Sequence, residues 1–168
     1  MPYTPIIGTL GYVLDAETDS VLMVHRTART NDDHLGKFNG LGGKLEENED
    51  VASGMLRELH EEAEIVVTAM SLRGTVNWPG FGPNLEDWLG FIFLITGWEG
   101  TPPPSNPEGD LHWIPRRRVL NDPSLPTLPM WEGDRSFLPL VFDDDPRPFH
   151  GVMPYHQGVP SSWSYCRL

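Results

Sequence analysis

Cysteine is almost absent from this chain, since the 168 residues include only Cys166. A single cysteine cannot form an internal disulfide, and no Cys/His spacing typical of a metal site occurs. No apolar run approaches the roughly 20 residues that a membrane helix needs. Residues 1–10 lack the basic segment that precedes the apolar stretch of a signal peptide. We therefore expect a cytoplasmic protein with no membrane partner.

Basic residues are also scarce. Lys and Arg number 12 against 24 Asp and Glu, which gives a formal charge of -12. Such a chain has no general basic footprint for duplex DNA or RNA. If the substrate carries phosphates, a divalent cation held by carboxylates would offset the repulsion. The alternative is a solvated acidic surface, which composition alone favours, so a metal site has to be argued from particular residues.

Hydrophobic residues make up 39% of the chain, enough for one buried core, and the length suits a single domain over residues 1–168. Apolar patterns and turn residues predict strands at 6–14, 20–25, 65–76, 88–98, 111–114 and 151–155. Residues 78–84 are expected to form a loop. Helical segments are expected at 50–62 and 116–120 and within 131–142, where Pro139 requires a kink or a start just before it. This irregular mixture favours a mixed sheet covered by helices.

The most informative stretch lies in the expected helix 50–62 and reads Arg57-Glu58-Leu59-His60-Glu61-Glu62. At about 100° per residue, Glu58, Glu61 and Glu62 fall on one helix face, where like charges repel one another. A hard cation such as Mg²⁺ or Mn²⁺ would reverse that cost, because it prefers oxygen ligands and leaves positions open for phosphate and water. Arg57 can brace a carboxylate with its planar donor fork. The alternative is an exposed acidic helix face without a ligand.

Residues upstream of these glutamates argue against that alternative. Together they form the pattern Gly-x5-Glu-x7-Arg-Glu-Leu-x-Glu-Glu, which sets a loop, a helix entry and a helix face in fixed register. Residues 43–65 resemble the signature box of the Nudix hydrolases, and the matching positions are Gly43, Glu49, Arg57, Glu58, Leu59, Glu61, Glu62 and Ile65. One position departs, since Glu64 stands where the family has glycine. Glycine lets the chain leave the helix with positive φ, so Glu64 should strain or reshape that turn while activity survives.

The resemblance implies an α/β/α sandwich around a mixed central β-sheet, and hydrolysis of a nucleoside diphosphate joined to a further group. It also implies a divalent metal, Mg²⁺ with Mn²⁺ as an alternative, that neutralises the phosphates and activates water. The metal ligands implied by position are the Gly43 carbonyl, Glu58, Glu61, Glu62 and a further acid, Glu108. The catalytic residues implied are Glu58, Glu61, Arg57 and Glu49, with Arg57 orienting the glutamates through Glu49. The sequence does not decide which carboxylate takes the proton of the water.

The resemblance extends over most of the chain to the MutT-type branch of the family, which removes oxidised purine nucleoside triphosphates. It is carried by residues 36–44, 130–134 and 149–151. The substrate-binding residues that it implies are Arg26, Phe38, Asn39, Trp131 and Asp134. A purine needs a flat apolar wall and polar groups at its edge, which Trp131, Asn39 and Asp134 can supply. One departure bears on the base: Gly133-Asp134 stands where the mammalian-type pocket has two adjacent aspartates.

Each of these residues also has a purely structural interpretation. Trp131 could pack in the core, and Asn39 could serve a turn. Asp134 could cap a helix, which need not prevent it from binding a ligand. Arg26 and Glu108 could be surface charges.

Further aromatic and acidic residues keep two interpretations. Trp78, Phe81 and Trp88 could line the mouth of a pocket or cover an edge of the sheet. Residues 143–145 are three successive aspartates before a proline. They resemble a metal cluster, but such a run is more often a solvated turn that ends a helix.

The leading hypothesis is hydrolysis of a nucleoside triphosphate to monophosphate and pyrophosphate, with an oxidised purine such as 8-oxo-dGTP as substrate. A second hypothesis changes the substrate to a nucleotide sugar, ADP-ribose or a dinucleoside polyphosphate. A third is a module that senses nucleotides without turnover, which the intact Glu58, Glu61 and Glu62 argue against. In each case the partner is a small-molecule nucleotide, and the protein is expected to be a monomer or a homodimer.

Overall fold

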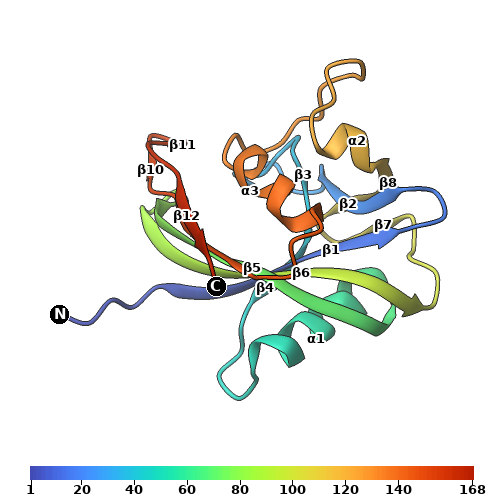
Figure 1. Cartoon of the computed structure of the whole chain (residues 1–168), viewed down its shortest axis with the longest axis horizontal. Coiled ribbons are helices and arrows are strands. Elements are labelled where there is room, and N and C mark those ends of the chain that lie inside the picture. The colour runs from blue at the N-terminus through green and yellow to red at the C-terminus, as the bar shows by residue number, and fades with distance from the viewer.

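A mixed β-sheet forms the centre of the computed structural model, which describes residues 1–168 (Figure 1). Its strands follow the order β12-β9-β5-β6-β1-β2-β8-β7, with β3 paired to β2 and β4 paired to β1. The β1–β6 and β5–β9 pairs are parallel and the others are antiparallel. The bounds are β1 (Ile6–Asp15), β2 (Ser20–Arg26), β3 (Phe38–Asn39), β4 (Leu41–Lys44), β5 (Val66–Phe81), β6 (Glu86–Glu99), β7 (Ser105–Asn106), β8 (Gly109–Pro115), β9 (Phe149–Val152) and β12 (Ser164–Arg167). A separate hairpin consists of β10 (Tyr155–His156) and β11 (Val159–Pro160).

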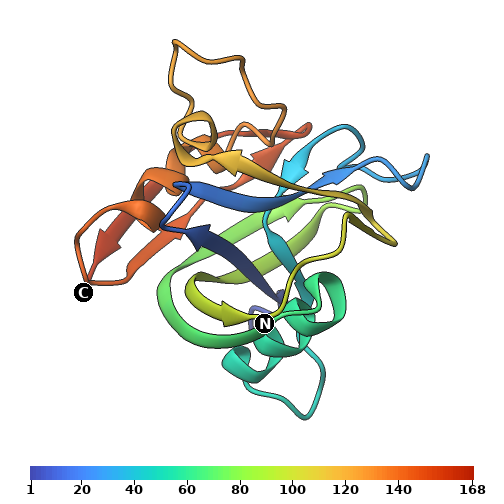
Figure 2. The same ribbon diagram turned by 90° about the vertical axis from the view of Figure 1, so that its right-hand side faces the viewer.

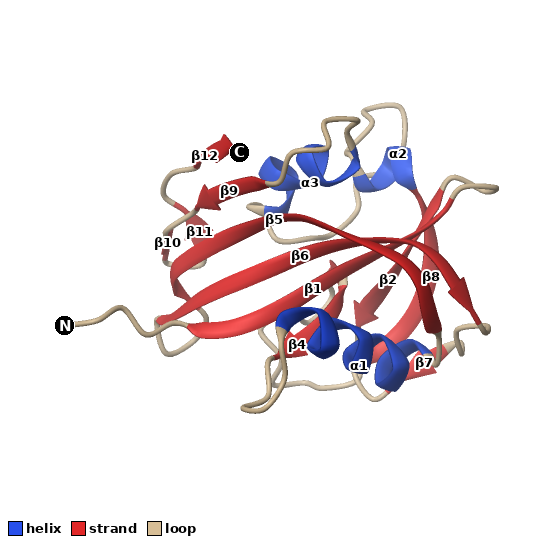
Figure 3. Cartoon of the chain, turned by 60° about the horizontal axis from the view of Figure 1, so that its bottom comes forward, coloured by secondary structure: helices blue, strands red, loops and turns tan.

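Helices cover both faces of this sheet, as Figures 2 and 3 show. Helix α1 (Val51–Ala63) lies on one face, and α2 (Arg116–Val119) and α3 (Asp134–Phe142) lie on the other. Each face has its own buried apolar cluster: Met55 and Leu59 of α1 belong to one, and Phe137 and Val141 of α3 belong to the other. The three predicted helical segments are confirmed, and each end lies within three residues of its predicted position. No helix has the length and apolar character that crossing a membrane requires.

The ends of α1 follow from its sequence. Asp50 precedes the helix, and its carboxylate accepts a hydrogen bond from the Ser53 amide at 2.8 Å, as an N-cap does. At the other end Glu64 adopts the left-handed conformation, with φ 54°, and its amide donates to the His60 carbonyl at 3.1 Å. The turn thus keeps the form that glycine would take, and the glutamate accommodates the strain.

Strand β5 is longer than the sequence predicts. Residues 78–81, expected to begin a loop, continue the strand, and Phe81 pairs with Glu86 of β6. The register shifts between Trp78 and Phe81, so Pro79 and Gly80 sit in an irregular stretch of the ladder. A bulge tolerates proline because its residues leave the regular hydrogen-bond pattern.

The C-terminal region also differs from the prediction of a last strand at 151–155. Strand β9 ends at Val152, and Pro154, which has no amide donor, lies between it and the β10–β11 hairpin. The last strand is β12, which returns to pair with β9 at the edge of the sheet.

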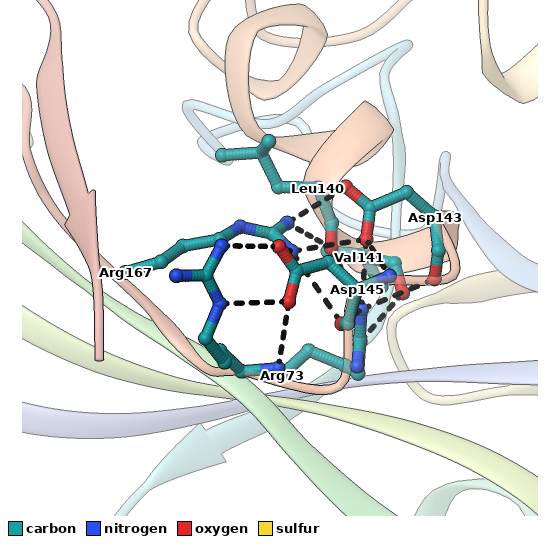
Figure 4. Close-up of polar contacts among 7 residues, drawn as sticks. Arg73, Leu140, Val141, Asp143, Asp145 and Arg167 are labelled. Carbon is teal, nitrogen blue, oxygen red and sulfur yellow. Dashed lines mark hydrogen bonds and ion pairs between the residues drawn. The ribbon is translucent and has the colours of Figure 1, made fainter.

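Helix α3 contains Pro139 as its sixth residue and is fixed at its C-terminus by two arginines (Figure 4). The Arg73 Nε donates to the Val141 carbonyl at 2.9 Å, and its Nη2 reaches the Leu140 carbonyl at 3.2 Å. Arg167 Nη2 also donates to the Leu140 carbonyl, at 3.3 Å. Because the last carbonyls of a helix have no partner within it, these arginines (hereafter the arginine clamp) replace the missing donors.

The arginine clamp also decides between the two interpretations of the aspartates at 143–145. Asp143 lies 3.1 Å from Arg73 Nη2 and 2.7 Å from Arg167 Nη2. Asp145 lies 3.1 Å from Arg167 Nη1. The run is therefore an ion-paired turn that ends α3, close to the helix-ending interpretation.

Candidate active site

Arg57 lies at the centre of the acidic face of α1. Its Nη2 and Nε donate to the two carboxylate oxygens of Glu49 at 2.7 and 3.0 Å. Its Nη1 donates to Glu58 at 2.9 Å and to Glu61 at 3.3 Å. The hydrogen bonds that Arg57 donates to Glu49 raise the pKa of Arg57, and the same contact lowers the pKa of Glu49. The structure thus brings Arg57 to the helix-entry glutamate and to two of the three helix-face glutamates.

Gly43 of β4 allows Glu58 to approach the backbone closely. A Cβ at position 43 would lie 2.6 Å from Glu58 Oε1, so a side chain there would push the Glu58 carboxylate away from β4. The Glu58 side chain is 12% exposed, and burial raises its pKa. The same loop reaches the third glutamate, because the Gly42 amide donates to Glu62 Oε2 at 3.3 Å.

Glu108 approaches this cluster from the turn between β7 and β8. Asn106 links that turn to α1, since its side chain accepts from the Glu108 amide at 2.9 Å and donates to the Glu62 carbonyl at 3.2 Å. Arg26 Nη1 lies 3.0 Å from Glu108, and Arg26 Nε lies 2.8 Å from Asp32. In this structure Arg26 therefore braces carboxylates, although it also lines the cavity described below.

These closely spaced carboxylates are suited to binding a divalent cation. Burial, followed by the charges of Glu108 and Glu58, raises the pKa of Glu62 to about 8. The available donors are carboxylate and carbonyl oxygens, which Mg²⁺ and Mn²⁺ prefer. No three His, Cys, Asp or Glu side chains are already arranged as a ligand set, and Glu61, with 57% of its side chain exposed, pairs with Arg57. The Glu58 and Glu62 carboxylates already act on each other, whereas Glu61 would have to leave Arg57 to join them.

A cavity of about 430 Å³ opens beside the glutamate cluster, with Gly43 and Glu108 at its rim and an aromatic wall. The wall is formed by Trp78, Phe81, Trp88, Trp131 and Tyr155. Phe81 contacts Trp131 and Tyr155 edge to face, with ring centroids 5.0 and 4.9 Å apart. The volume lies within the range of small-molecule sites, about 300–1,000 Å³. The three aromatics of residues 78–88 therefore line the pocket.

Polar side chains meet the aromatic wall at one place. Asn39, His34 and Asp134 all line the cavity. Trp131 Nε1 donates to His34 Nδ1 at 2.7 Å, and Asn39 Nδ2 lies 3.2 Å from the same nitrogen. Burial raises the pKa of Asp134 to about 7, so this carboxyl can be protonated near neutral pH. Asp134 is the first residue of α3 and makes no capping hydrogen bond, so the capping interpretation is wrong.

A glycine allows one ring of the aromatic wall to lie close to the sheet. Gly90 of β6 lies beneath Trp78 of the neighbouring strand, and a Cβ at position 90 would overlap the Trp78 ring. Both residues line the cavity. The ring therefore rests on the sheet instead of projecting into the space above it.

The structure brings most of the predicted site residues together. Those that line the cavity are Arg26, Asn39, Gly43, Glu108, Trp131 and Asp134. The predicted residues of α1 and Glu49 do not line the cavity but form the acidic cluster beside Gly43. Phe38 joins neither group: it is buried in the core, and its ring stacks on His25 with centroids 4.2 Å apart. Neighbouring residues in a strand face opposite sides, so Asn39 in the cavity requires Phe38 to point away.

His34 and Tyr155 are lining residues that the sequence did not indicate, as are Gly8, Thr9, Leu10 and Gly90. His34 belongs to a polar segment between strands, and Tyr155 belongs to a short hairpin. Neither segment carries a periodic pattern or a motif that would have identified its residue.

Comparisons with known proteins support the family resemblance. The model of the family described as "NUDIX domain" matches residues 4–141. The "Uncharacterized Nudix hydrolase YvcI" of Bacillus subtilis is 27% identical over 139 residues, covering 82% of this chain and 80% of that protein. The "Oxidized purine nucleoside triphosphate hydrolase" of Mus musculus is 31% identical over 107 residues, covering 63% of each chain.

Solved structures share the fold. The crystal structure of the mutator MutT protein from Bacillus halodurans superposes with a TM-score of 0.78 and 27% identity, covering 95% of this chain and 97% of that one. The NUDIX domain of Shewanella oneidensis NrtR, solved in complex with ADP-ribose, superposes with a TM-score of 0.65 and 17% identity, covering 82% and 86%. The expected α/β/α sandwich around a mixed sheet is therefore confirmed.

Proposed function

Because the chain belongs to the Nudix hydrolase family, we propose that it is a Mg²⁺-dependent nucleotide pyrophosphohydrolase, with Mn²⁺ as an alternative metal. It cleaves an oxidised purine nucleoside triphosphate, of the 8-oxo-dGTP type, to the monophosphate and pyrophosphate. The observation that carries the proposal is the position of the cavity, whose aromatic wall opens onto Gly43 and Glu108 beside the glutamates of α1. The active unit is a single domain of residues 1–168, as a monomer or a homodimer.

The acidic cluster binds the phosphate end of the substrate. Its metal ligands are the Gly43 carbonyl, Glu58, Glu61, Glu62 and Glu108, all oxygen donors. When bound, the divalent cation neutralises the phosphates and lowers the pKa of a water molecule. Arg57 positions the carboxylates, since it already contacts Glu49, Glu58 and Glu61. A carboxylate of this cluster accepts the proton of the attacking water.

The other end of the cavity binds the base. Trp131 offers a flat ring for stacking, and Asn39 offers both an acceptor and a donor at the base edge. Asp134, with a pKa of about 7, can present a protonated or an ionised oxygen near neutral pH. An oxidised guanine differs from guanine by a carbonyl at C8 and an N–H at N7, so hydrogen-bond matching can distinguish the two. The likeness to the mouse enzyme, named for oxidised purine nucleoside triphosphates, supports this choice.

A second candidate is hydrolysis of another nucleoside diphosphate derivative, such as ADP-ribose, a nucleotide sugar or a dinucleoside polyphosphate. The NrtR domain, which shares the fold, was solved with ADP-ribose. The same glutamates would serve this reaction, because the metal acts on the diphosphate and not on the attached group.

A substrate panel with Mg²⁺ separates these functions. We expect pyrophosphate and 8-oxo-dGMP from 8-oxo-dGTP, a higher kcat/KM than for dGTP, and no reaction when the metal is chelated. AMP and ribose 5-phosphate from ADP-ribose, at a higher kcat/KM, would establish the second candidate instead. Tight binding without turnover of any nucleotide would identify a sensing module and overturn both.

The role of Trp131 is tested in the same assay. Replacing Trp131 by alanine removes the stacking surface but leaves the acidic cluster intact, so we expect KM to rise more than kcat falls. An unchanged KM for 8-oxo-dGTP would contradict a base site at this ring.

A further inference from the structure

His34 receives two donors on one ring nitrogen. The Trp131 indole Nε1 lies 2.7 Å from His34 Nδ1, and the Asn39 amide Nδ2 lies 3.2 Å from it. The three residues come from the β2–β3 connection, from β3 and from the segment before α3. All three line the cavity, so the contact joins the stacking ring to a polar group at the base edge.

The indole nitrogen fixes the protonation of His34. An indole N–H can only donate, so at 2.7 Å the imidazole Nδ1 must carry its lone pair. The ring is then neutral with its proton on Nε2, since a protonated ring would offer a second N–H where a lone pair is needed. A half-buried indole donor that loses its acceptor is left without a protein partner, which is unfavourable.

The same lone pair fixes the orientation of Asn39. An amide can present either its oxygen or its NH₂ group to a neighbour, and an acceptor nitrogen selects the NH₂ group. The carbonyl oxygen of Asn39 is therefore left free for a ligand. If Nδ1 carried a proton, the amide would be drawn to turn over and offer the ligand donors in place of that acceptor.

The groups around His34 favour its neutral form. Burial, followed by the charge of Arg26, lowers the pKa of His34. The charged groups that act on it are Arg26, Asp32, Asp33 and Lys37, of which the two aspartates oppose the shift. The neighbouring rings of Phe81 (β5) and Trp131 are uncharged, and their centroids lie 6.1 and 5.3 Å from the His34 centroid.

We propose that His34 is a positioning residue that sets substrate specificity, because its neutral Nδ1 holds the Trp131 ring and the Asn39 amide in the orientation that a base requires. The substrate part of this inference rests on the proposed hydrolase function. The positioning part does not, because it concerns contacts present in the protein alone.

Two variants separate the acceptor atom from the bulk of the side chain. His34→Leu removes the acceptor, whereas His34→Asn keeps one, because Oδ1 is attached to Cγ as Nδ1 is. We expect His34→Leu to raise KM for 8-oxo-dGTP by about tenfold with kcat within about threefold, the effect of one lost hydrogen bond. His34→Asn should recover most of the loss. An unchanged KM in His34→Leu, or no recovery in His34→Asn, would overturn the proposal.

The dependence of KM on pH gives a second kinetic test. Protonation of His34 below its pKa removes the lone pair, so KM of the parent protein should rise between pH 7 and pH 5 relative to KM of His34→Asn. Acidic groups such as Asp134 titrate in both proteins, and their effect cancels in the ratio. A ratio that stayed constant down to the lowest pH at which the protein remains folded would contradict a role for the neutral imidazole.

Indole N–H signals in a ¹⁵N-labelled sample test the positioning without any nucleotide. The chain has 6 tryptophans, and loss of one signal in Trp131→Phe assigns Trp131. We expect this proton to be shifted downfield, to move upfield on acidification and in His34→Leu, and to stay downfield in His34→Asn. If these shifts were observed but no nucleotide were hydrolysed, only the proposed hydrolase function would be refuted. If the Trp131 indole signal changed neither with pH nor in His34→Leu, the positioning role of His34 would be refuted, even in an active enzyme.

Discussion

Replacing Arg73 by methionine keeps an apolar stem of similar length but removes the guanidinium from the end of α3. The Arg73 side chain is 9% exposed and lies near five acceptors: the Val141 and Leu140 carbonyls, the Asp143 and Asp145 carbonyls, and the Asp143 carboxylate. Four of these contacts use Nη2, which has only two protons, so the equivalent of about three hydrogen bonds is lost.

The expected loss of stability follows from that count. A hydrogen bond with a charged partner contributes about 1.5–3 kcal/mol, but Arg167 continues to contact the same turn, so we expect a loss of about 3 kcal/mol. For a chain of this size, this corresponds to a decrease in Tm of about 6–12 °C. Circular dichroism during thermal and urea unfolding measures both quantities.

Two further variants make the measurement specific. Arg147→Met removes an ion pair of similar length, 2.8 Å to Asp145, but its side chain is 60% exposed, so we expect a change below about 1 kcal/mol. Arg73→Met and Arg167→Met should be non-additive, because the two arginines share the Leu140 carbonyl and Asp143. If Arg73→Met cost no more than Arg147→Met, the assigned role of the arginine clamp in fixing α3 would be wrong.

Three other substitutions have defined outcomes. Glu61→Gln should lower the rate of Mg²⁺-dependent pyrophosphate release by about a hundredfold or more without changing the circular dichroism spectrum, because it removes a ligand charge from an exposed helix face; a near-normal rate would contradict its assignment as a metal ligand. Asp134 has its pKa raised to about 7 by burial, so the folded state binds its proton more tightly than the unfolded state. The stability that this proton contributes is present below about pH 4 and is lost as the pH rises to about 7. The Tm of Asp134→Asn minus the Tm of the parent should therefore increase over this range. A constant difference would refute the burial of the Asp134 carboxyl. Glu64→Gly should raise the free energy of unfolding by about 1 kcal/mol, measured in urea, because glycine adopts positive φ without the strain of a Cβ; a loss of stability would show that the glutamate makes a compensating contact.

Local signals predict much of this fold. Asp50 before an apolar repeat identified the start of α1, and helix geometry put Glu58, Glu61 and Glu62 on one face. The acidic site as a whole was identified by the resemblance of residues 43–65 to the Nudix signature box. Non-local pairing was harder to predict. The continuation of β5 through Pro79 depends on a bulge against β6, and β12 forms only because β9 offers it an edge.

The base end of the cavity illustrates the same limit. Trp131 and Asn39 were predicted from segments that resemble a known family, but His34 and Tyr155 become neighbours of Trp131 only when distant segments fold together. Phe38 was assigned to the site because it adjoins Asn39 in sequence, yet strand alternation turns it into the core. Arg73 was likewise not identified, since nothing around a lone arginine in a strand shows that it will cap a helix some 70 residues later.

Because Gly90 has no side chain, the Trp78 ring can lie close to the sheet at the side of the cavity. Alanine at position 90 would force the Trp78 indole away from the sheet, and the rings of Phe81 and Phe137, which contact it, would have to adjust. The space that the cavity offers a ligand therefore depends on the absence of a side chain from β6, whereas the three helix-face glutamates lie on α1.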